Sequence, residues 1–195
     1  MQSNDTGVNN FNTAGLIDAG RSLLLVIDFQ QRLMPAIHDG AAVLRNAVIL
    51  AQGAKMLAIP ALATEQYPRG LGHTAPELAA LCPESVEKTT FGSCGTPAFG
   101  TALARLSPCS APTLLVCGCE AHVCVLQTVL QLQAQGVDVR VVVDAVGART
   151  VQSKEIALRR MEAAGIALVT TEMVVFEWLR DARHAQFRAL SALIK

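Results

Sequence analysis

Short apolar runs alternate with longer segments of helical periodicity along most of the chain, and this alternation is the strongest constraint on its fold. Runs with the length of buried strands span 22–29, 56–64, 85–90, 113–118, 137–145 and 165–171. Apolar spacing typical of amphipathic helices spans 41–55, 97–106, 121–135 and 151–164. Strand–helix repetition with right-handed crossovers predicts a three-layer, doubly wound, Rossmann-like α/β fold. Its sheet would have six mainly parallel strands, with helices on both faces.

The chain length of 195 residues fits one domain. We expect a loose N-terminal tail over 1–20, and a single domain over 21–195 that ends in two helices split around Arg183. The tail has two aspartates and no basic residue before Arg21, which fits neither a secretory signal nor a transit peptide. Glutamines interrupt the longest uncharged stretch, so no membrane span is predicted. These features favour a cytoplasmic protein.

Charge and hydropathy narrow the choice of partners. The chain has 16 basic and 16 acidic residues, so it lacks the positive field that nucleic acids and anionic membranes attract. A small-molecule substrate is the remaining expectation. Hydrophobic residues make up 51% of the chain and charged residues 16%, which predicts apolar surface shared in a homo-oligomer. The candidate interfaces are the helix at 121–135 and the C-terminal segment, where Trp178 and Phe187 could act as anchors.

Three chemically distinctive residues are predicted at one edge of the sheet. In open α/β sheets, ligands bind beyond the carboxyl ends of the strands. Asp28 follows the first strand, Lys88 lies in the third, and Cys124 lies in the first turn of the helix after the fourth. Cys124 and Lys88 alone are more often structural residues, and Asp28 alone is as readily a turn or cap residue, but a buried acid and a buried lysine each require a partner. A helix N-terminus would lower the pKa of the Cys124 thiol, which makes it a candidate nucleophile.

The other cysteines are predicted to be reduced and structural. Cys117 lies inside an apolar strand, where cysteine behaves as a small hydrophobe. The other four, which have no obvious base nearby, are Cys82, Cys94, Cys109 and Cys119. An alternative use is a zinc site built from Cys117, Cys119, His122 and Cys124. That set lacks the usual C-x-x-C spacing, so no metal is expected. No phosphate-binding loop is present either, so we expect no cofactor.

Three ordered motifs resemble the isochorismatase-like cysteine hydrolases, a family that includes nicotinamidase and N-carbamoylsarcosine amidohydrolase. They are "LLVIDFQ", "VEKTTFGS" and "LLVCGCEAHVCVLQTVLQLQAQGVDVRVVVDA". "TEQYPRGLG" and "RRMEAAGIALVTTE" look closest to the isochorismatase domain-containing branch. The resemblance implies a catalytic triad of Asp28, Lys88 and Cys124. It also implies a cis peptide at Cys119–Glu120, an oxyanion hole formed by the N–H groups of Glu120 and Cys124, and an assembly between dimer and octamer.

Departures from the family pattern bear on the substrate. Nicotinamidases carry a metal-binding Asp-x-His after the second strand, where this chain has Gln66 and Pro68, and the nearby His73 alone is no metal site. The thiol argues against vinyl-ether cleavage, and Ala121 replaces a common threonine. The residues expected to bind substrate, from their positions beyond the strand ends, are Leu33, Tyr67, Phe91 and His122. Two hypotheses follow: a cofactor-free cysteine hydrolase of a small amide or carbamoyl compound, or a catalytically idle scaffold or binding subunit.

Overall fold

All six strands run parallel in one sheet, in the order β3-β2-β1-β4-β5-β6. The computed structural model describes residues 15–195. The strands are β1 (Ser22–Ile27), β2 (Ala61–Gln66), β3 (Ser85–Lys88), β4 (Thr113–Cys119), β5 (Asp138–Gly147) and β6 (Ala167–Val169). Strands β2 and β3 lie on one side of the central strand β1, and β4, β5 and β6 lie on its other side. The predicted doubly wound α/β sheet is confirmed, and its strand order reverses between β1 and β4, where such sheets bind ligands.

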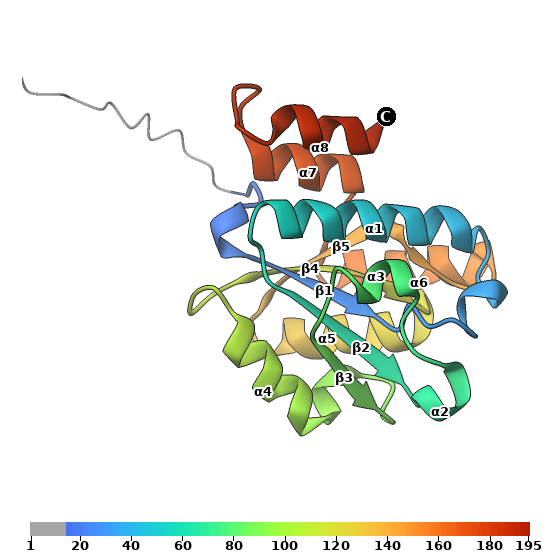
Figure 1. Cartoon of the computed structure of the whole chain (residues 1–195). Helices are drawn as coiled ribbons and strands as arrows, with labels where there is room; N and C mark the ends of the chain where they lie inside the picture. The colour runs from blue at the N-terminus through green and yellow to red at the C-terminus, as the bar shows by residue number, and fades with distance from the viewer. Residues whose placement is uncertain (1–14) are drawn as a thin grey trace, which may run out of the picture.

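Helices cover both faces of the sheet (Figure 1). The α-helices are α1 (Gly40–Met56), α2 (Pro68–Leu71), α3 (Pro76–Ala79), α4 (Pro97–Leu106), α5 (Leu126–Ala134), α6 (Val151–Ala163), α7 (Thr171–Leu179) and α8 (Phe187–Ile194). Helix α1 lies on one face, with α7 and α8 stacked beyond it, and α4 and α5 lie on the opposite face. Within residues 15–195, every helix is too short or too polar to cross a bilayer.

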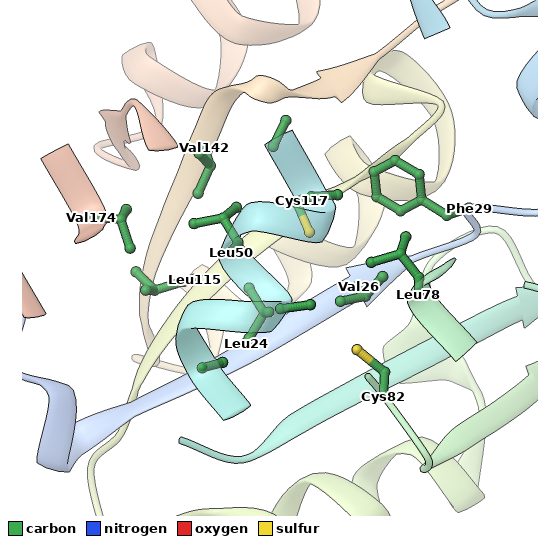
Figure 2. Close-up of a cluster of buried hydrophobic side chains, with 14 of the residues drawn as sticks. Leu24, Val26, Phe29, Leu50, Leu78, Cys82, Leu115, Cys117, Val142 and Val174 are labelled. Atoms are coloured by element: carbon green, nitrogen blue, oxygen red, sulfur yellow. The ribbon is translucent and has the colours of Figure 1, made fainter. Parts of the chain in front are cut away.

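The core consists of two apolar layers, one on each side of the sheet. Every residue of β1 is buried, because this central strand is covered on both faces. Its side chains alternate between the layers: Leu24 and Val26 face α1, whereas Leu23 and Leu25 face α4 and α5. Figure 2 shows the layer on the α1 side, where Cys117 lies among leucine and valine side chains. This layer therefore uses cysteine as a small apolar residue.

The elements differ from the sequence-based expectation in several places. The second strand begins at Ala61 instead of residue 56, because α1 continues to Met56 and the chain then turns through Ala58 at φ +55°. The predicted helix at 121–135 begins with a π-helical turn at Ala121–Val125 before the regular helix α5. The short helices α2 and α3 were not predicted; each begins with a proline, a residue suited to the first helical turn.

The two ends of the described chain pack together. Residues 1–14 of the expected loose tail lie outside the described residues, but Ile17 is fully buried and its N–H donates to Glu177 Oε2 over 2.6 Å. The proposed interface anchor Trp178 is also buried, at 3% exposure, and its Nε1 donates to Ser22 Oγ over 3.0 Å. The expectation that Trp178 anchors an oligomer interface is therefore wrong, because the indole completes the subunit's own core.

Candidate active site

A fully buried ion pair joins the ends of β1 and β3. Asp28 follows β1 with a φ of +53°, and Lys88 is the last residue of β3. Lys88 reaches across the intervening strand β2, so that its Nζ lies 2.7 Å from Asp28 Oδ2, and both side chains have no solvent exposure. Thr64 of β2 donates its hydroxyl to Asp28 Oδ1 over 2.7 Å. Both predicted charged residues are thus brought together, and each supplies the partner that burial requires.

The Lys88 ammonium is held by three oxygen atoms. Its Nζ donates to Asp28 Oδ2 over 2.7 Å, to Gln66 Oε1 over 2.8 Å and to the backbone carbonyl of Phe91 over 3.2 Å. An ammonium group has three N–H donors, so these contacts use all of them. The lysine is therefore fixed by β1, β2 and the loop that follows β3.

The Cys124 thiol lies beside this ion pair, on the turn that follows the neighbouring strand β4. Cys124 belongs to the π-helical turn after β4, and its Sγ is 4.0 Å from Gln66 Oε1. Burial raises the pKa of the Cys124 thiol to about 12; Asp28 raises it further, while Lys88 lowers it. The sequence argument from the helix N-terminus predicted a lowered pKa. Burial outweighs that effect, so the resting sulfur is a neutral thiol beside a buried carboxylate.

The peptide bond between Cys119 and Glu120 is cis. The Glu120 carboxylate, which belongs to a residue only 8% exposed, accepts two hydrogen bonds from Arg149: 2.8 Å to Nε and 3.0 Å to the terminal nitrogen. A bidentate guanidinium–carboxylate pair is geometrically specific. It ties the turn that leads to Cys124 to the loop between β5 and α6.

The four residues predicted to bind substrate occupy different settings. Tyr67 and Phe91 are 56% and 54% exposed, and both contact Lys88 through their backbones: the Tyr67 N–H donates to Lys88 O, and Phe91 O accepts from Lys88 Nζ. His122 is partly buried, and its Nδ1 has no hydrogen-bond partner within residues 15–195. Leu33 instead packs against the apolar layer under α1. The two aromatic residues are therefore the ones anchored directly to the site.

A hollow of about 560 Å³ opens beside the ion pair. It is lined by Tyr67, Pro68, Arg69, Glu87, Lys88, Thr89, Thr90, Gly95, Thr96 and Pro97. Of the predicted site residues it includes Tyr67 and Lys88, whereas Cys124 is not part of the lining.

The cysteines of the zinc alternative do not converge. Cys117 and Cys119 belong to the layer under α1, whereas Cys124 belongs to the opposite layer. All six cysteines are unpaired. Among residues 15–195, no group of three or more His, Cys, Asp or Glu side chains is arranged to hold a metal ion. The sheet itself separates these thiols, which a linear spacing argument does not reveal.

Sequence reasoning missed two glutamines at the centre of the site. The side chain of Gln66 contacts both Lys88 and Cys124, and its Nε2 donates to Thr89 O over 2.8 Å. Gln30 is fully buried and brackets the Gln66 backbone, accepting from its N–H over 2.8 Å and donating to its carbonyl over 3.0 Å. Both follow or end a buried strand, so the rule that selected Asp28 could have found them.

A second, partly exposed charged cluster lies further along β2. Buried Glu65 accepts from the Thr74 N–H over 2.7 Å and from the Thr74 hydroxyl over 2.8 Å, and pairs with His73 Nδ1 at 3.0 Å. Burial raises the Glu65 pKa, but these hydrogen bonds outweigh it and the pKa is lowered overall. The Glu65 carboxylate raises the pKa of His73. This cluster fastens the loop after α2 to the sheet.

Together these features define an α/β protein with a buried acid–lysine pair and a thiol at the switch point of its sheet. The sequence model of the isochorismatase domain matches residues 22–173. Mouse isochorismatase domain-containing protein 2A is 37% identical over 174 residues, covering 89% of this chain and 82% of that protein. The chain belongs to the isochorismatase domain family, as the sequence motifs predicted.

Two solved structures share the fold. The MAR1 ribonuclease of Caenorhabditis elegans has a TM-score of 0.83 and 35% identity, and the match covers 92% of both chains. The YcaC gene product of Escherichia coli, an octameric hydrolase of unknown specificity, has a TM-score of 0.85 and 26% identity. That match covers 92% of this chain and 89% of the YcaC chain. The chain is therefore a member of an isochorismatase-like hydrolase family.

Proposed function

We propose that this protein hydrolyses a small amide, carbamoyl or related carbonyl C–N compound, with Cys124 as nucleophile. The observation that carries the proposal is the ion pair between Asp28 and Lys88, which has no solvent exposure and lies against the thiol. Burying two charges is unfavourable, and a pair of well-packed apolar residues would often be as stable. A carboxylate that can accept a thiol proton gives this arrangement a catalytic use.

In the proposed first half-reaction, Asp28 takes the proton of Cys124 as the sulfur forms a bond to the carbonyl carbon. The Lys88 ammonium keeps the developing negative charge compensated. The N–H groups of Glu120 and Cys124 stabilise the tetrahedral oxyanion. When this intermediate collapses, the C–N bond breaks and Asp28 gives the proton that it took from Cys124 to the leaving nitrogen. The product is a thioester on Cys124 and a free amine or ammonia.

The second half-reaction restores the enzyme. Asp28 removes a proton from water, whose oxygen attacks the thioester carbon. The C–S bond then breaks, the sulfur regains a proton from Asp28, and the acid leaves. Tyr67 and Phe91 contact Lys88 through their backbones, and their exposed rings would contact the substrate, with His122 and Leu33 as further candidate contacts. No step requires a metal ion or a cofactor.

The direct test compares the wild type with Cys124→Ala on a panel of small amides, carbamoyl compounds and vinyl ethers. We expect release of ammonia or amine from at least one C–N compound by the wild type and none by the variant. Trapping the thioester with hydroxylamine identifies the acyl group. Equal turnover by Cys124→Ala would exclude the thiol mechanism, and turnover of vinyl ethers alone would place the activity in another reaction class.

A catalytically idle binding subunit is the second candidate. It is favoured by one observation: burial raises the pKa of the Cys124 thiol to about 12, and Cys124 is not among the residues that line the adjacent hollow. An idle subunit would give no turnover over the whole panel, yet some panel compounds would still raise the melting temperature of both the wild type and Cys124→Ala. Ribonuclease activity, for which the nematode relative is named, has less support because this chain carries no net positive charge.

We also propose that the chain works as a homo-oligomer in the cytoplasm. With Trp178 inside the subunit, the candidate contacts are exposed apolar residues, namely Leu16, Tyr67, Phe91, Val151, Ile156, Met173 and Phe176. A reducing compartment suits six unpaired cysteines. Light scattering at micromolar concentration should give a multiple of 20.6 kDa. A single-chain mass that is unchanged on dilution would exclude self-association.

A further inference from the structure

One oxygen atom links two members of the proposed triad. Gln66 Oε1 accepts a hydrogen bond from Lys88 Nζ over 2.8 Å and lies 4.0 Å from Cys124 Sγ, at the outer limit of a hydrogen bond to sulfur. The amide cannot turn freely, because its Nε2 donates to Thr89 O over 2.8 Å. The Gln66 backbone is also fixed by the buried side chain of Gln30, which accepts from the Gln66 N–H and donates to the Gln66 carbonyl.

The contact between Gln66 Oε1 and Lys88 matters because the ammonium group has only three N–H donors. Asp28, Gln66 and the Phe91 carbonyl accept the three available N–H groups, so the Cys124 sulfur must compete with these oxygens for any Lys88 N–H that it contacts. A thiolate at Cys124 would need such a donor, because burial disfavours the charged form. Two acceptors lie beside the sulfur, the Gln66 amide oxygen at 4.0 Å and the Asp28 carboxylate, and both favour a protonated thiol.

We propose that Gln66 is a positioning residue that sets the charge state of Cys124: by occupying one Lys88 N–H, it keeps the resting sulfur protonated and the ammonium directed at Asp28. The inference extends the proposed function, since it assigns a control on the same nucleophile. The thiol is thereby protected from adventitious alkylation and oxidation, which act on thiolates. It becomes nucleophilic only when its proton passes to Asp28 during attack.

The charged and titratable groups around the thiol are few, so substitutions at Gln66 have opposite expected signs. Asp28 and Lys88 act on the sulfur directly; Glu120, paired with Arg149, precedes the turn that carries it, and His122 lies within that turn. In Gln66→Glu, a second carboxylate would compete for the ammonium and repel a thiolate. In Gln66→Met, which has nearly the same length, the freed Lys88 N–H could turn to the sulfur and stabilise the thiolate.

The experiment measures how fast iodoacetamide alkylates Cys124 from pH 7 to pH 10, with the modified peptide identified by mass spectrometry. Compared with the wild type at pH 8, we expect alkylation about tenfold slower in Gln66→Glu and about tenfold faster in Gln66→Met, which corresponds to about one pKa unit in each direction. Gln127→Met, a matched change at an exposed position of α5, should leave the rate unchanged. Melting temperatures show whether each variant is folded.

Opposite shifts in the two variants would support the inference, because a merely structural glutamine would change both rates in the same direction or neither. Shifts of the same sign, or unchanged rates in folded variants, would overturn it. If Gln66→Glu does not fold, the rate of Gln66→Met alone decides, and a rate equal to or below the wild type refutes the inference. The alkylation assay needs no substrate, so opposite shifts without any amide turnover would refute the proposed function alone.

Discussion

Cys117 and Cys124 are seven positions apart in the chain and are both buried, but they lie on opposite sides of the sheet. Cys117 packs in the layer under α1, where its Sγ lies 3.7 Å from the backbone oxygen of Leu25. Cys124 packs in the opposite layer beside Asp28, Lys88 and Gln66. Burial raises the pKa of both thiols, so desolvation alone does not distinguish them.

The difference lies in what each sulfur can exchange a proton with. Cys117 lies in an apolar layer and has no side-chain base in contact within the described residues 15–195, whereas Cys124 has a buried carboxylate next to it. The same residue type is core material in one layer and a candidate nucleophile in the other. Cys117 lies within β4 and points into one layer, whereas Cys124 lies on the turn after β4 and packs in the other layer. Two thiols close together in sequence therefore occupy separate environments.

Breaking the ion pair should have the largest effect. Lys88→Met leaves Asp28 as an unpaired carboxylate with no solvent exposure, which we expect to destabilise the fold by about 3–5 kcal/mol. Urea unfolding measures the loss. The double variant Asp28→Asn with Lys88→Met should recover most of the stability, because neither charge then remains buried.

Arg183→Met is the control for that experiment, because its ion pair with Asp181 lies at the surface. It should leave the unfolding midpoint nearly unchanged. If Lys88→Met were as stable as this control, Asp28 would not depend on Lys88 for its charge. The electrostatic difference between the surroundings of Cys117 and Cys124 would then be unsupported.

Alkylation kinetics of the wild type sharpen the contrast between the thiols. With a pKa of about 12, Cys124 should react with iodoacetamide about tenfold faster for each pH unit from 7 to 10, without a plateau. Cys117 should stay unmodified in the folded protein, since it has no solvent exposure. Peptide mapping follows both sites in one sample. A rate of Cys124 alkylation that reaches a plateau below pH 9 would instead support the lowered thiol pKa that the helix N-terminus predicts.

The sequence was sufficient for the fold but only partly sufficient for the site. Periodicity identified all six strands, including the polar β3, because strand–helix alternation is repeated along the chain. The strand-end rule found Asp28 and Lys88, and their pairing at 2.7 Å follows from the strand order. The role of Gln66 escaped notice because it depends on which side-chain atoms meet. The neutral state of Cys124 depends on burial depth, which a linear pattern does not contain.

Serine substitutions should separate the two thiols by stability and by activity. Cys117→Ser places a hydroxyl in an apolar layer and should destabilise the protein by roughly 1–2 kcal/mol. Cys124→Ser keeps polar neighbours for the hydroxyl and should destabilise it less, while abolishing amide turnover. Urea unfolding and the hydrolysis assay, run on both variants, give the comparison. A larger loss of stability at Cys124 than at Cys117 would contradict the assignment of the two layers.

The smallest effect should come from Glu65 and His73, which lie one residue and one short loop away from Gln66 along the chain. The raised pKa of His73 means that its charge stabilises the fold below its ordinary value of 6.5, and that this contribution is lost as the pH rises through the folded-state value. The lowered pKa of Glu65 means that its charge stabilises the fold above 4.5, and that this contribution is lost as the pH falls through the folded-state value. Both groups are therefore charged together between these values.

His73→Gln tests this window, because glutamine can still donate a hydrogen bond but carries no charge. Relative to the wild type, its melting temperature should fall at pH 5.5, and the difference should shrink as the pH rises and the wild-type imidazole loses its proton. Added salt should shrink the difference, since the His73 side chain is 75% exposed and its charge is screened by solvent. An equal loss at every pH would assign the contact to hydrogen bonding alone.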